Sequence, residues 1–368
     1  MKRYFTMLVV AVLAVCSCRF SAYAVSTDSA AAILMDAASG RVLYAQNIHE
    51  PMLIASTTKL LTALVAVELC DDLDCNIAVK AEWTGIEGSS MYLQAGEIVS
   101  MRELLYGLLL QSGNDAALAI ACFIAGDEGA FADLMNEKAK TLGMVNSHFV
   151  NPSGLNHEQH YSTAYDMALL ARACLENETV SEICATKSAV FGTRTFYNHN
   201  KLLSRYEGCV GMKTGYTELA GRTLVSAAER NGQILICVTL NDRNDWKDHE
   251  KLLDYGFSAY PQKTLCNAGM SFGQVRVEGS LLPAVSALLA ENVVFPLAEG
   301  EVPDVRVDLP SVLYAPVTCG DLIGEVSWLL DGNVIARAGL VSSKNAGNDV
   351  YLRRSVREHI LRWLDRMH

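Results

Sequence analysis

The chain has 368 residues, of which 51% are hydrophobic and 19% are charged, and its formal net charge is −11. This composition excludes an intrinsically disordered chain, and the length suffices for about two domains of ~150 residues each. Acidic residues outnumber basic ones by 41 to 30, which argues against nucleic acid as a partner because phosphate backbones attract basic surfaces.

Residues 1–24 have the pattern of a secretory signal peptide. Lys2 and Arg3 give a basic start, and Met7 to Val15 form a short apolar core. Ala22-Tyr23-Ala24 then offers a small-x-small cleavage site. The apolar run is too short to span a membrane comfortably, since a spanning helix needs about 20 residues. We therefore predict that the mature protein is exported.

The cysteines do not form a recognisable framework. Two of the 11, Cys16 and Cys18, fall in the predicted signal peptide, and the remaining nine are irregularly spaced. No cysteine and histidine cluster has zinc-ligand spacing, so the cysteines do not predict a zinc site. Cys70 and Cys75 are candidates for a bridge, whereas most other cysteines sit in apolar runs typical of buried thiols.

The first chemically informative stretch follows two predicted strands, over 31–36 and 41–45. Ile54-Ala55-Ser56-Thr57-Thr58-Lys59 leads into an apolar run over 60–69 at helical spacing. Ser56 is expected at or near the helix N-terminus, where serine is a favoured cap. Positions i and i+3 share a helix face, so the Ser56 hydroxyl and the Lys59 amine can meet.

That pairing has chemical meaning. A serine hydroxyl is a poor nucleophile unless a base takes its proton, and lysine becomes a base only when burial or a second cation lowers its pKa. Ser56 and Lys59 are therefore candidates for a nucleophile and its base. A capped helix with a lysine in its first turn explains the same four residues, and the motif alone does not decide between the two interpretations.

A second motif lies between two predicted helices. Ser100-Met101-Arg102-Glu103 is a capping box that opens the first helix, which ends at Gln111-Ser112-Gly113-Asn114-Asp115, and the second helix covers 116–125. Before them, Thr84 to Glu97 is predicted to be loop. Ser112 and Asn114 thus occupy a tight turn, which by itself is ordinary turn chemistry.

Further along, the pattern predicts helices over 131–142, 163–175 and 246–255. Asn231-Gly232 predicts a hairpin between strands over 222–229 and 233–240, because this dipeptide favours the two-residue hairpin turn. Just before that hairpin stands the stretch Gly208 to Thr217, which contains Lys213-Thr214-Gly215.

The composition changes after Pro261. Five of the eight prolines lie between Pro283 and Pro316, and short runs alternate as strands do. We predict a small all-β domain over 262–348 and a helix over 349–368. The apolar face of this helix consists of Leu352, Val356, Ile360, Trp363 and Met367.

Three motifs now stand in order: Ser56-x-x-Lys59, Ser112-Gly113-Asn114 and Lys213-Thr214-Gly215. Together they resemble the penicillin-recognising serine acyltransferases, whose signatures are S-x-x-K, S-x-N and K-T-G. The stretches from His148 to Asp166 and from Leu252 to Phe257 narrow the resemblance to the low-molecular-mass D-alanyl-D-alanine carboxypeptidases.

The resemblance implies an α+β fold, with an antiparallel sheet flanked by helices as in serine β-lactamases and DD-peptidases. This catalytic domain would cover 25–261. The likeness is looser for the all-β domain and the terminal helix.

The resemblance also implies catalytic roles. Ser56 would attack the penultimate carbonyl of a peptidoglycan stem peptide ending in D-Ala-D-Ala, and Lys59 would take its proton. Ser112 would relay that proton to the leaving D-alanine, with Lys213 as a second candidate for this relay. Water would then release the acyl-enzyme, and no metal or organic cofactor would be required. β-Lactam antibiotics would acylate the same serine.

Substrate-binding roles follow in the same way. Asn114 would orient the substrate amide, and Lys213 and Thr214 would bind the terminal carboxylate through charge-assisted contacts. Gly215 would let the substrate backbone approach closely. The N–H of Tyr216, with that of the nucleophile, would form the oxyanion hole.

One departure from the family pattern concerns His199. In Asn198-His199-Asn200 a histidine stands where some relatives are expected to have arginine. Contacts to the substrate carboxylate on that side of the cleft are expected to differ accordingly.

Other functions use the same motifs. A DD-endopeptidase would need the same residues, and a serine β-lactamase would need a further general base, for which we place no glutamate. A non-catalytic wall-binding scaffold is the alternative from another class, although the complete motifs speak against it.

The terminal helix has two interpretations. A basic amphipathic helix with a tryptophan can lie in a membrane surface, or it can pack on the β-domain with its arginines solvated. The resemblance favours the surface anchor, which would place the protein at the outer face of the cytoplasmic membrane or in the cell wall.

Overall fold

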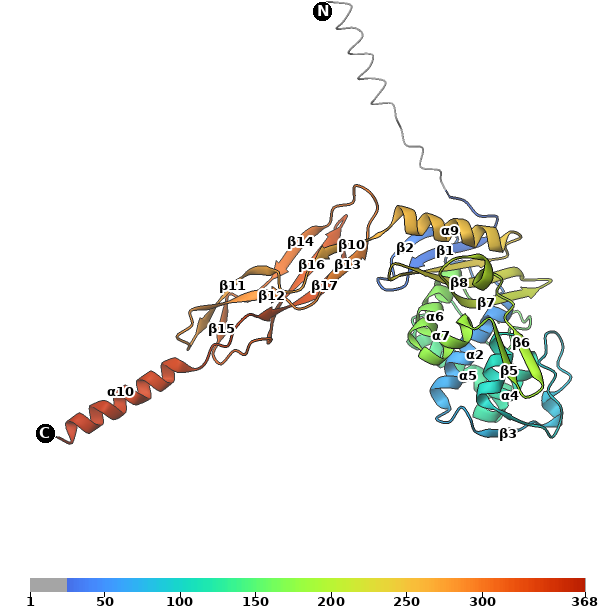
Figure 1. Ribbon diagram of the computed structural model, residues 1–368, viewed down its shortest axis with the longest axis horizontal. Coiled ribbons are helices and arrows are strands. Elements are labelled where there is room, and N and C mark those ends of the chain that lie inside the picture. The colour runs from blue at the N-terminus through green and yellow to red at the C-terminus, as the bar shows by residue number, and fades with distance from the viewer. Residues whose placement is uncertain (1–24, 368) are drawn as a thin grey trace, which may run out of the picture.

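The computed structural model describes the backbone of residues 25–367 and the side chains of residues 25–348, 355–364 and 366–367. The predicted signal peptide and the side chain of Leu352 lie outside these described residues. Figure 1 shows a larger mixed body of helices and sheet, an elongated all-β part, and a terminal helix at the far end.

The larger body is built on a five-stranded antiparallel sheet with the order β2-β1-β9-β8-β7. Its strands are β1 (Ala31–Asp36), β2 (Val42–Gln46), β7 (Cys209–Thr217), β8 (Gly221–Arg230) and β9 (Gln233–Leu240). The predicted hairpin is confirmed, since Asn231 (φ 52°) and Gly232 (φ 79°) have the positive φ values that a type I′ turn requires. β1 pairs with β9, which joins the start of the described chain to a strand about 200 residues later.

Strand alternation divides the core into two layers. Ile33 and Met35 of β1 face the cluster that contains α2 (Lys59–Leu69) and α6 (Ala164–Glu176). The intervening Leu34 faces the opposite cluster, which α9 (Asp245–Ala259) covers. Both faces of the sheet are therefore buried, and α2 lies within the structure between the sheet and further helices.

Those further helices are α3 (Met101–Leu109), α4 (Asn114–Ala125), α5 (Glu128–Thr141), α7 (Glu178–Ala185) and α8 (Leu202–Arg205). The predicted cap is confirmed, since the N–H of Glu103 donates to the Ser100 hydroxyl over 3.0 Å. The predicted helix over 131–142 starts three residues earlier, because the side chain of Asp127 caps it. The predicted helix over 246–255 extends to Ala259, with Gly256 packed against Leu34 and Leu235.

The sequence patterns missed several short elements. These are helix α7, the hairpin of β5 (Ser188–Phe191) and β6 (Arg194–Tyr197), and the strand pair β3 (Asn76–Ala78) and β4 (Ile98–Ser100). Each is too short for a periodic pattern to stand out. The nine cysteines of the described chain, Cys70 and Cys75 among them, are all free thiols.

The predicted all-β part is present. Its strands are β10 (Gln262–Cys266), β11 (Ser271–Glu278), β12 (Ala284–Leu289), β13 (Val293–Pro296), β14 (Asp304–Asp308), β15 (Val312–Tyr314), β16 (Leu322–Leu330) and β17 (Asn333–Ser342). Six of them form a sheet with the order β14-β16-β17-β12-β11-β15, and β10 pairs with β13. Arg41 joins this part to the larger body, since its guanidinium donates to both carboxylate oxygens of Glu301 over 2.9 and 2.6 Å.

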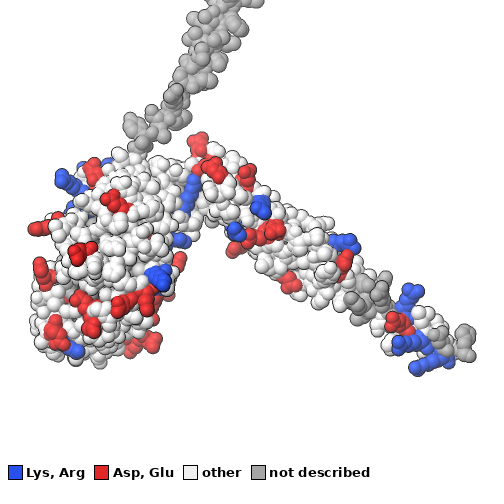
Figure 2. Space-filling view, turned by 180° about the vertical axis from the view of Figure 1, so that it is seen from behind, with Lys and Arg blue, Asp and Glu red and all other residues white. Residues whose placement is uncertain are grey.

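Helix α10 (Asp349–Asp365) ends the described chain. The predicted helix over 349–368 thus ends at Asp365. Apolar side chains are at least half exposed at Val356, Ile360 and Trp363 of this helix and at Met367 beyond its end. Figure 2 shows blue side chains gathered around this helix, which carries the exposed Arg357 and Arg362 and is followed by the exposed Arg366. None of the helices in the described chain combines the length and the apolarity that a membrane crossing needs.

Candidate active site

Ser56 lies on a short 3-10 turn, Ala55–Thr58, that leads directly into α2. Ser56 thus lies near the N-terminus of α2, as expected, but it does not cap the helix: it is the second residue of this turn, and Thr58 holds the N-cap position. Ala55 has a positive φ of 47°, a conformation that costs an alanine about 1 kcal/mol or more. The strained backbone sets Ser56 at the start of the helix, on the side of the sheet strand β7.

Lys59 is the centre of the site. Its Nζ lies 2.9 Å from Ser56 Oγ, 2.7 Å from Asn114 Oδ1 and 2.6 Å from the carbonyl oxygen of Ser153. The first of these distances confirms the prediction that the Ser56 hydroxyl and the Lys59 amine meet. The other two partners come from segments 55 and 94 residues away.

The environment of Lys59 disfavours its charged form. The side chain is fully buried, and this burial holds the pKa of Lys59 well below its ordinary value. The nearby Lys213 lowers this pKa further, while Asp115 opposes the shift. A neutral amine is the form that a general base requires.

Ser112 and Asn114 form the second wall of the site. Ser112 has a positive φ of 62° at the turn between α3 and α4, and its side chain lines the cavity next to Ser56. Asn114 is buried, and besides its contact with Lys59 its Nδ2 donates to the carbonyl of Glu87 over 2.6 Å. One N–H of that amide group therefore remains for another acceptor.

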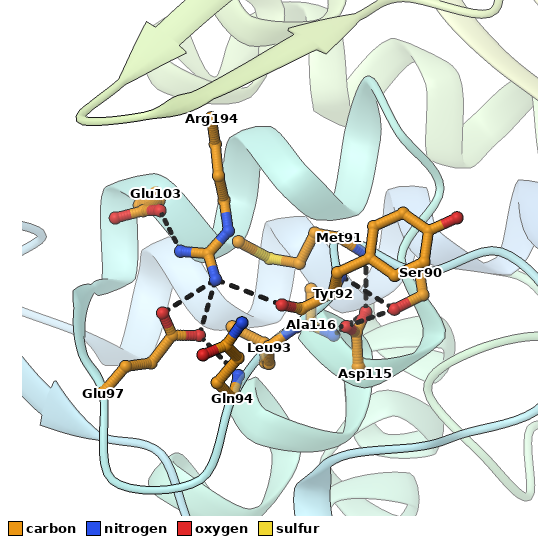
Figure 3. A network of polar contacts seen from close by, with 10 residues as sticks. All are labelled: Ser90, Met91, Tyr92, Leu93, Gln94, Glu97, Glu103, Asp115, Ala116 and Arg194. Carbon is orange, nitrogen blue, oxygen red and sulfur yellow. Dashed lines mark hydrogen bonds and ion pairs between the residues drawn. The ribbon is translucent and has the colours of Figure 1, made fainter.

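The loop over 84–97 is fastened to this turn (Figure 3). The buried Asp115 accepts hydrogen bonds from the backbone N–H groups of Met91 and Leu93, both over 3.0 Å, and from the hydroxyl of Ser90 over 2.6 Å. These hydrogen bonds hold the irregular loop in place as one wall of the cavity. Ser89 of this loop lines the cavity.

Arg194 fastens the other end of the same loop (Figure 3). From the β5–β6 hairpin, its guanidinium donates to both oxygens of Glu97 over 2.7 Å and to Glu103 over 3.0 Å. Sequence patterns did not identify Asp115 or Arg194, because nothing local marks a charged residue whose partners lie in another segment.

The third motif lies on β7. Lys213 is buried, its ammonium donates to the carbonyl of Thr214 over 3.0 Å, and burial lowers the pKa of Lys213 to about 8. Thr214, Gly215 and Tyr216 border the cavity that contains Ser56.

Gly215 is required by close packing. A Cβ atom at this position would lie 2.3 Å from the Thr223 hydroxyl oxygen and 3.1 Å from the backbone nitrogen of Ser56. The strand can therefore approach the Ser56 turn only without a side chain here, and the space beside the Ser56 N–H stays open.

A cavity of about 310 Å³ joins these elements. Five of the eight predicted site residues line it: Ser56, Ser112, Thr214, Gly215 and Tyr216. The other three, Lys59, Asn114 and Lys213, are buried beneath it. Six further residues line the cavity. The sequence analysis placed His199 at the cleft but gave it no role, and it did not assign the other five to the site: Ser89, Lys201, Arg222, Asp245 and Trp246.

His160 supports the Ser56 turn from below. Val150 N–H donates to its Nδ1 over 3.3 Å, so the proton is on Nε2, which lies 2.8 Å from the Thr58 hydroxyl. Burial lowers the pKa of His160 to about 4, which keeps the ring neutral. This histidine holds the backbone of the site and does not line the cavity.

Comparison with known protein families gives two matches along the chain. Residues 19–244 match the family Peptidase S11, D-alanyl-D-alanine carboxypeptidase. Residues 260–348 match the C-terminal domain of penicillin-binding protein 5.

Similar proteins match over most of their length. D-alanyl-D-alanine carboxypeptidase DacF of Bacillus subtilis is 32% identical, with 89% of this chain and 89% of that protein covered. DacC of Escherichia coli is 34% identical, with 87% and 84% covered. The crystal structure of penicillin binding protein 5 from Haemophilus influenzae superimposes with a TM-score of 0.74 at 29% identity, covering 88% of this chain and 98% of that one.

Proposed function

We infer that this chain, which belongs to the D-alanyl-D-alanine carboxypeptidase family Peptidase S11, removes the terminal D-alanine of peptidoglycan stem pentapeptides through an acyl-enzyme on Ser56. Proteins of this family act on peptidoglycan peptides and bind β-lactams. The assignment of chemical roles to individual residues is our proposal, and it rests on the geometry described above.

One observation carries the proposal: the arrangement of three oxygen atoms around Lys59 Nζ. A neutral amine has two N–H bonds and one lone pair. The two N–H bonds point to Asn114 Oδ1 and to the Ser153 carbonyl, which can only accept. The lone pair is therefore directed at Ser56 Oγ, and it can take the hydroxyl proton as the oxygen attacks.

Attack on the penultimate carbonyl creates a negatively charged oxygen. The Ser56 nitrogen borders the space that Gly215 leaves open, and Tyr216 lines the same cavity. We propose that the N–H groups of these two residues stabilise this oxygen. Each such donor typically contributes ~3 kcal/mol to the transition state.

The proton must then reach the nitrogen of the leaving D-alanine. Ser112 lines the same cavity as Ser56, so its hydroxyl is placed to pass the proton on. Asn114 has one N–H left to hold a substrate carbonyl, while Thr214 and the ammonium of Lys213 bind the terminal carboxylate. Water attacks the Ser56 ester afterwards, with Lys59 again as the base.

The test is D-alanine release from a stem pentapeptide by the mature protein, compared with Ser56→Ala. We expect release by the wild type and none by the variant, together with a covalent penicillin adduct on the wild type alone. Adduct formation without D-alanine release would move the assignment to cross-linked peptides. An active Ser56→Ala variant would refute the nucleophile.

We also propose that the chain is exported and held at the outer face of the cytoplasmic membrane. Residues 1–24 have the sequence pattern of a signal peptide, and α10 combines exposed apolar side chains with arginines. Such a helix binds an anionic membrane surface by apolar burial and by about 1 kcal/mol per basic residue.

A further inference from the structure

We propose that Arg222 is a binding residue for the terminal carboxylate of the substrate, acting beside Lys213 and Thr214. This rests on the proposed function, which places that carboxylate at Thr214. Arg222 belongs to none of the three motifs, and it lines the same cavity as Ser56.

The strand register brings Arg222 to the correct side of the sheet. Arg222 at the start of β8 is the cross-strand partner of Tyr216, and Leu224 is the partner of Thr214. Partners in an antiparallel pair point to the same face, and so do residues two apart along a strand. Arg222 is thus the diagonal neighbour of Thr214, at about 7–8 Å between backbones, which an arginine side chain spans.

Arg222 is held in place by α9. Its Nε and Nη2 donate to the same oxygen of Asp245, Oδ2, over 3.0 and 2.8 Å, and its guanidinium lies 5.6 Å from the centre of the Trp246 ring. The other oxygen, Asp245 Oδ1, accepts the Trp246 N–H over 2.9 Å. The buried carboxylate and the ring therefore fix the guanidinium at the mouth of the cavity.

One edge of the guanidinium is left for a ligand. Within the part of the chain that the structure describes, Nη1 of Arg222 makes no hydrogen bond, and the side chain is 42% exposed. Because Asp245 neutralises much of the charge at long range, Arg222 acts by short hydrogen bonds to a carboxylate rather than by attraction from a distance.

Of the other basic residues here, Lys201 lines the cavity but is exposed, and no hydrogen bond or ion pair within the described residues holds its ammonium in place. Lys213 is buried and donates to the carbonyl of Thr214. His199, which stands where an arginine was expected, has its pKa lowered by burial and by Lys213, so it is neutral at pH 7. Arg222 keeps its charge at every physiological pH. Arg222, on β8, supplies the guanidinium that the chain lacks at position 199.

The experiment compares two substrates: an N-acylated L-Lys-D-Ala-D-Ala peptide and the same peptide with a terminal carboxamide. For Arg222→Gln we expect kcat/KM on the carboxylate substrate to fall by about 10- to 100-fold, the usual effect of losing a charged hydrogen bond. The carboxamide substrate should lose less than about threefold, since an amide does not need the cation. Arg222→Lys should retain part of the activity on the carboxylate substrate.

Arg230→Gln is a matched control from the other end of β8. Arg230 is likewise paired with an aspartate, Asp254, and lies over the rings of Tyr206 and Phe257, but it does not line the cavity. Arg230→Gln should leave the ratio of the kcat/KM values on the two substrates unchanged. Arg243→Gln tests the exposed arginine nearest in sequence to Asp245.

The outcomes separate this inference from the proposed function. An equal loss on both substrates, or a changed ratio with Arg243→Gln but not with Arg222→Gln, overturns the role of Arg222. If the wild type releases no D-alanine at all, the proposed function itself fails. An Arg222→Gln variant that keeps the wild-type melting temperature and penicillin adduct yield is properly folded. If its ratio of kcat/KM on the carboxylate substrate to kcat/KM on the carboxamide substrate equals that of the wild type, the role of Arg222 is also overturned.

Discussion

Gly154 lies directly against the backbone of Ala55. A Cβ atom at position 154 would stand 1.9 Å from the carbonyl oxygen of Ala55, and Gly154 has a φ of +83°. The loop that supplies the Ser153 carbonyl to Lys59 is therefore packed on the turn that carries Ser56. The positions of the nucleophile and of the partner of its base are therefore coupled through this backbone contact.

Gly154→Ala should consequently destabilise the protein and slow acylation together. We expect a loss of about 2–4 kcal/mol in the free energy of unfolding, from overpacking and from the positive φ. The penicillin acylation rate measures the effect on the site. Gly232→Ala is the control, since its φ is +79° but nothing lies near its added Cβ. A Gly154→Ala protein that acylates at the wild-type rate would contradict the coupling.

Lys59→Arg should abolish acylation, because it places a permanently charged guanidinium where the wild type has a neutral amine. Arginine does not lose its proton in proteins, so the variant has no lone pair for the Ser56 hydroxyl. We expect a loss of about 100- to 10,000-fold in acylation rate, the usual contribution of a general base. Lys80→Arg, at an exposed lysine, serves as the control. If Lys59→Arg retained more than a tenth of the activity, another group would have to be the base.

Stability should fall in mild acid because two histidines are buried in the neutral form. His249 lies between the hydroxyls of Ser226 and Thr239, and burial lowers its pKa to about 3, while that of His160 is lowered to about 4. Below pH ~6.5 the unfolded chain binds protons that the folded chain does not, so each histidine costs about 1.4 kcal/mol per pH unit. At pH 5 the two together should remove about 4 kcal/mol relative to pH 7.5.

Urea unfolding at pH 7.5, 6.0 and 5.0 measures this dependence. His249→Gln should have a shallower slope between pH 6.5 and pH 5, because it lacks one of the two groups. His157→Gln, at an exposed histidine, should keep the wild-type slope. If His249→Gln and the wild type had the same slope between pH 6.5 and pH 5, the His249 ring would not be held neutral.

Arg194→Gln should loosen the loop over 84–97 and weaken the site at a distance. The variant leaves Glu97 and Glu103 without their shared partner, with an expected loss of about 1–3 kcal/mol in stability. Since the loop holds Asn114 through the carbonyl of Glu87, acylation should slow by about 3- to 10-fold. Arg337→Gln removes an exposed pair with Glu325 and should change neither quantity measurably. Equal effects of the two variants would argue against the fastening role of Arg194.

Removing residues 349–368 should abolish binding to anionic vesicles. Sedimentation with vesicles containing phosphatidylglycerol should show binding of the full chain that weakens as salt is raised, because arginines and apolar side chains act together. Trp363→Glu should weaken binding at all salt concentrations, whereas D-alanine release from a soluble peptide should be unaffected. Binding of the truncated chain equal to that of the full chain would refute the anchor.

The sequence by itself determined the features that depend on near neighbours. The i, i+3 spacing of Ser56 and Lys59 places them 2.9 Å apart, and Asn231-Gly232 dictates its hairpin. Four of the five strands of the sheet, its long helices and the all-β part also follow from periodicity and composition, whereas no periodic pattern marks β7. Local sterics and burial on one face decide these features, and both are written into consecutive residues.

Tertiary structure alone decided how the site works. Asn114 and Ser153 meet Lys59 from 55 and 94 residues away, and this encounter turns a lysine into a directed base. The short hairpin β5–β6 escapes any periodic pattern, yet it carries Arg194 to the loop over 84–97. Arg222 reaches the cavity only because β7 and β8 pair in one register. Such contacts depend on packing between distant segments, which local propensity does not encode.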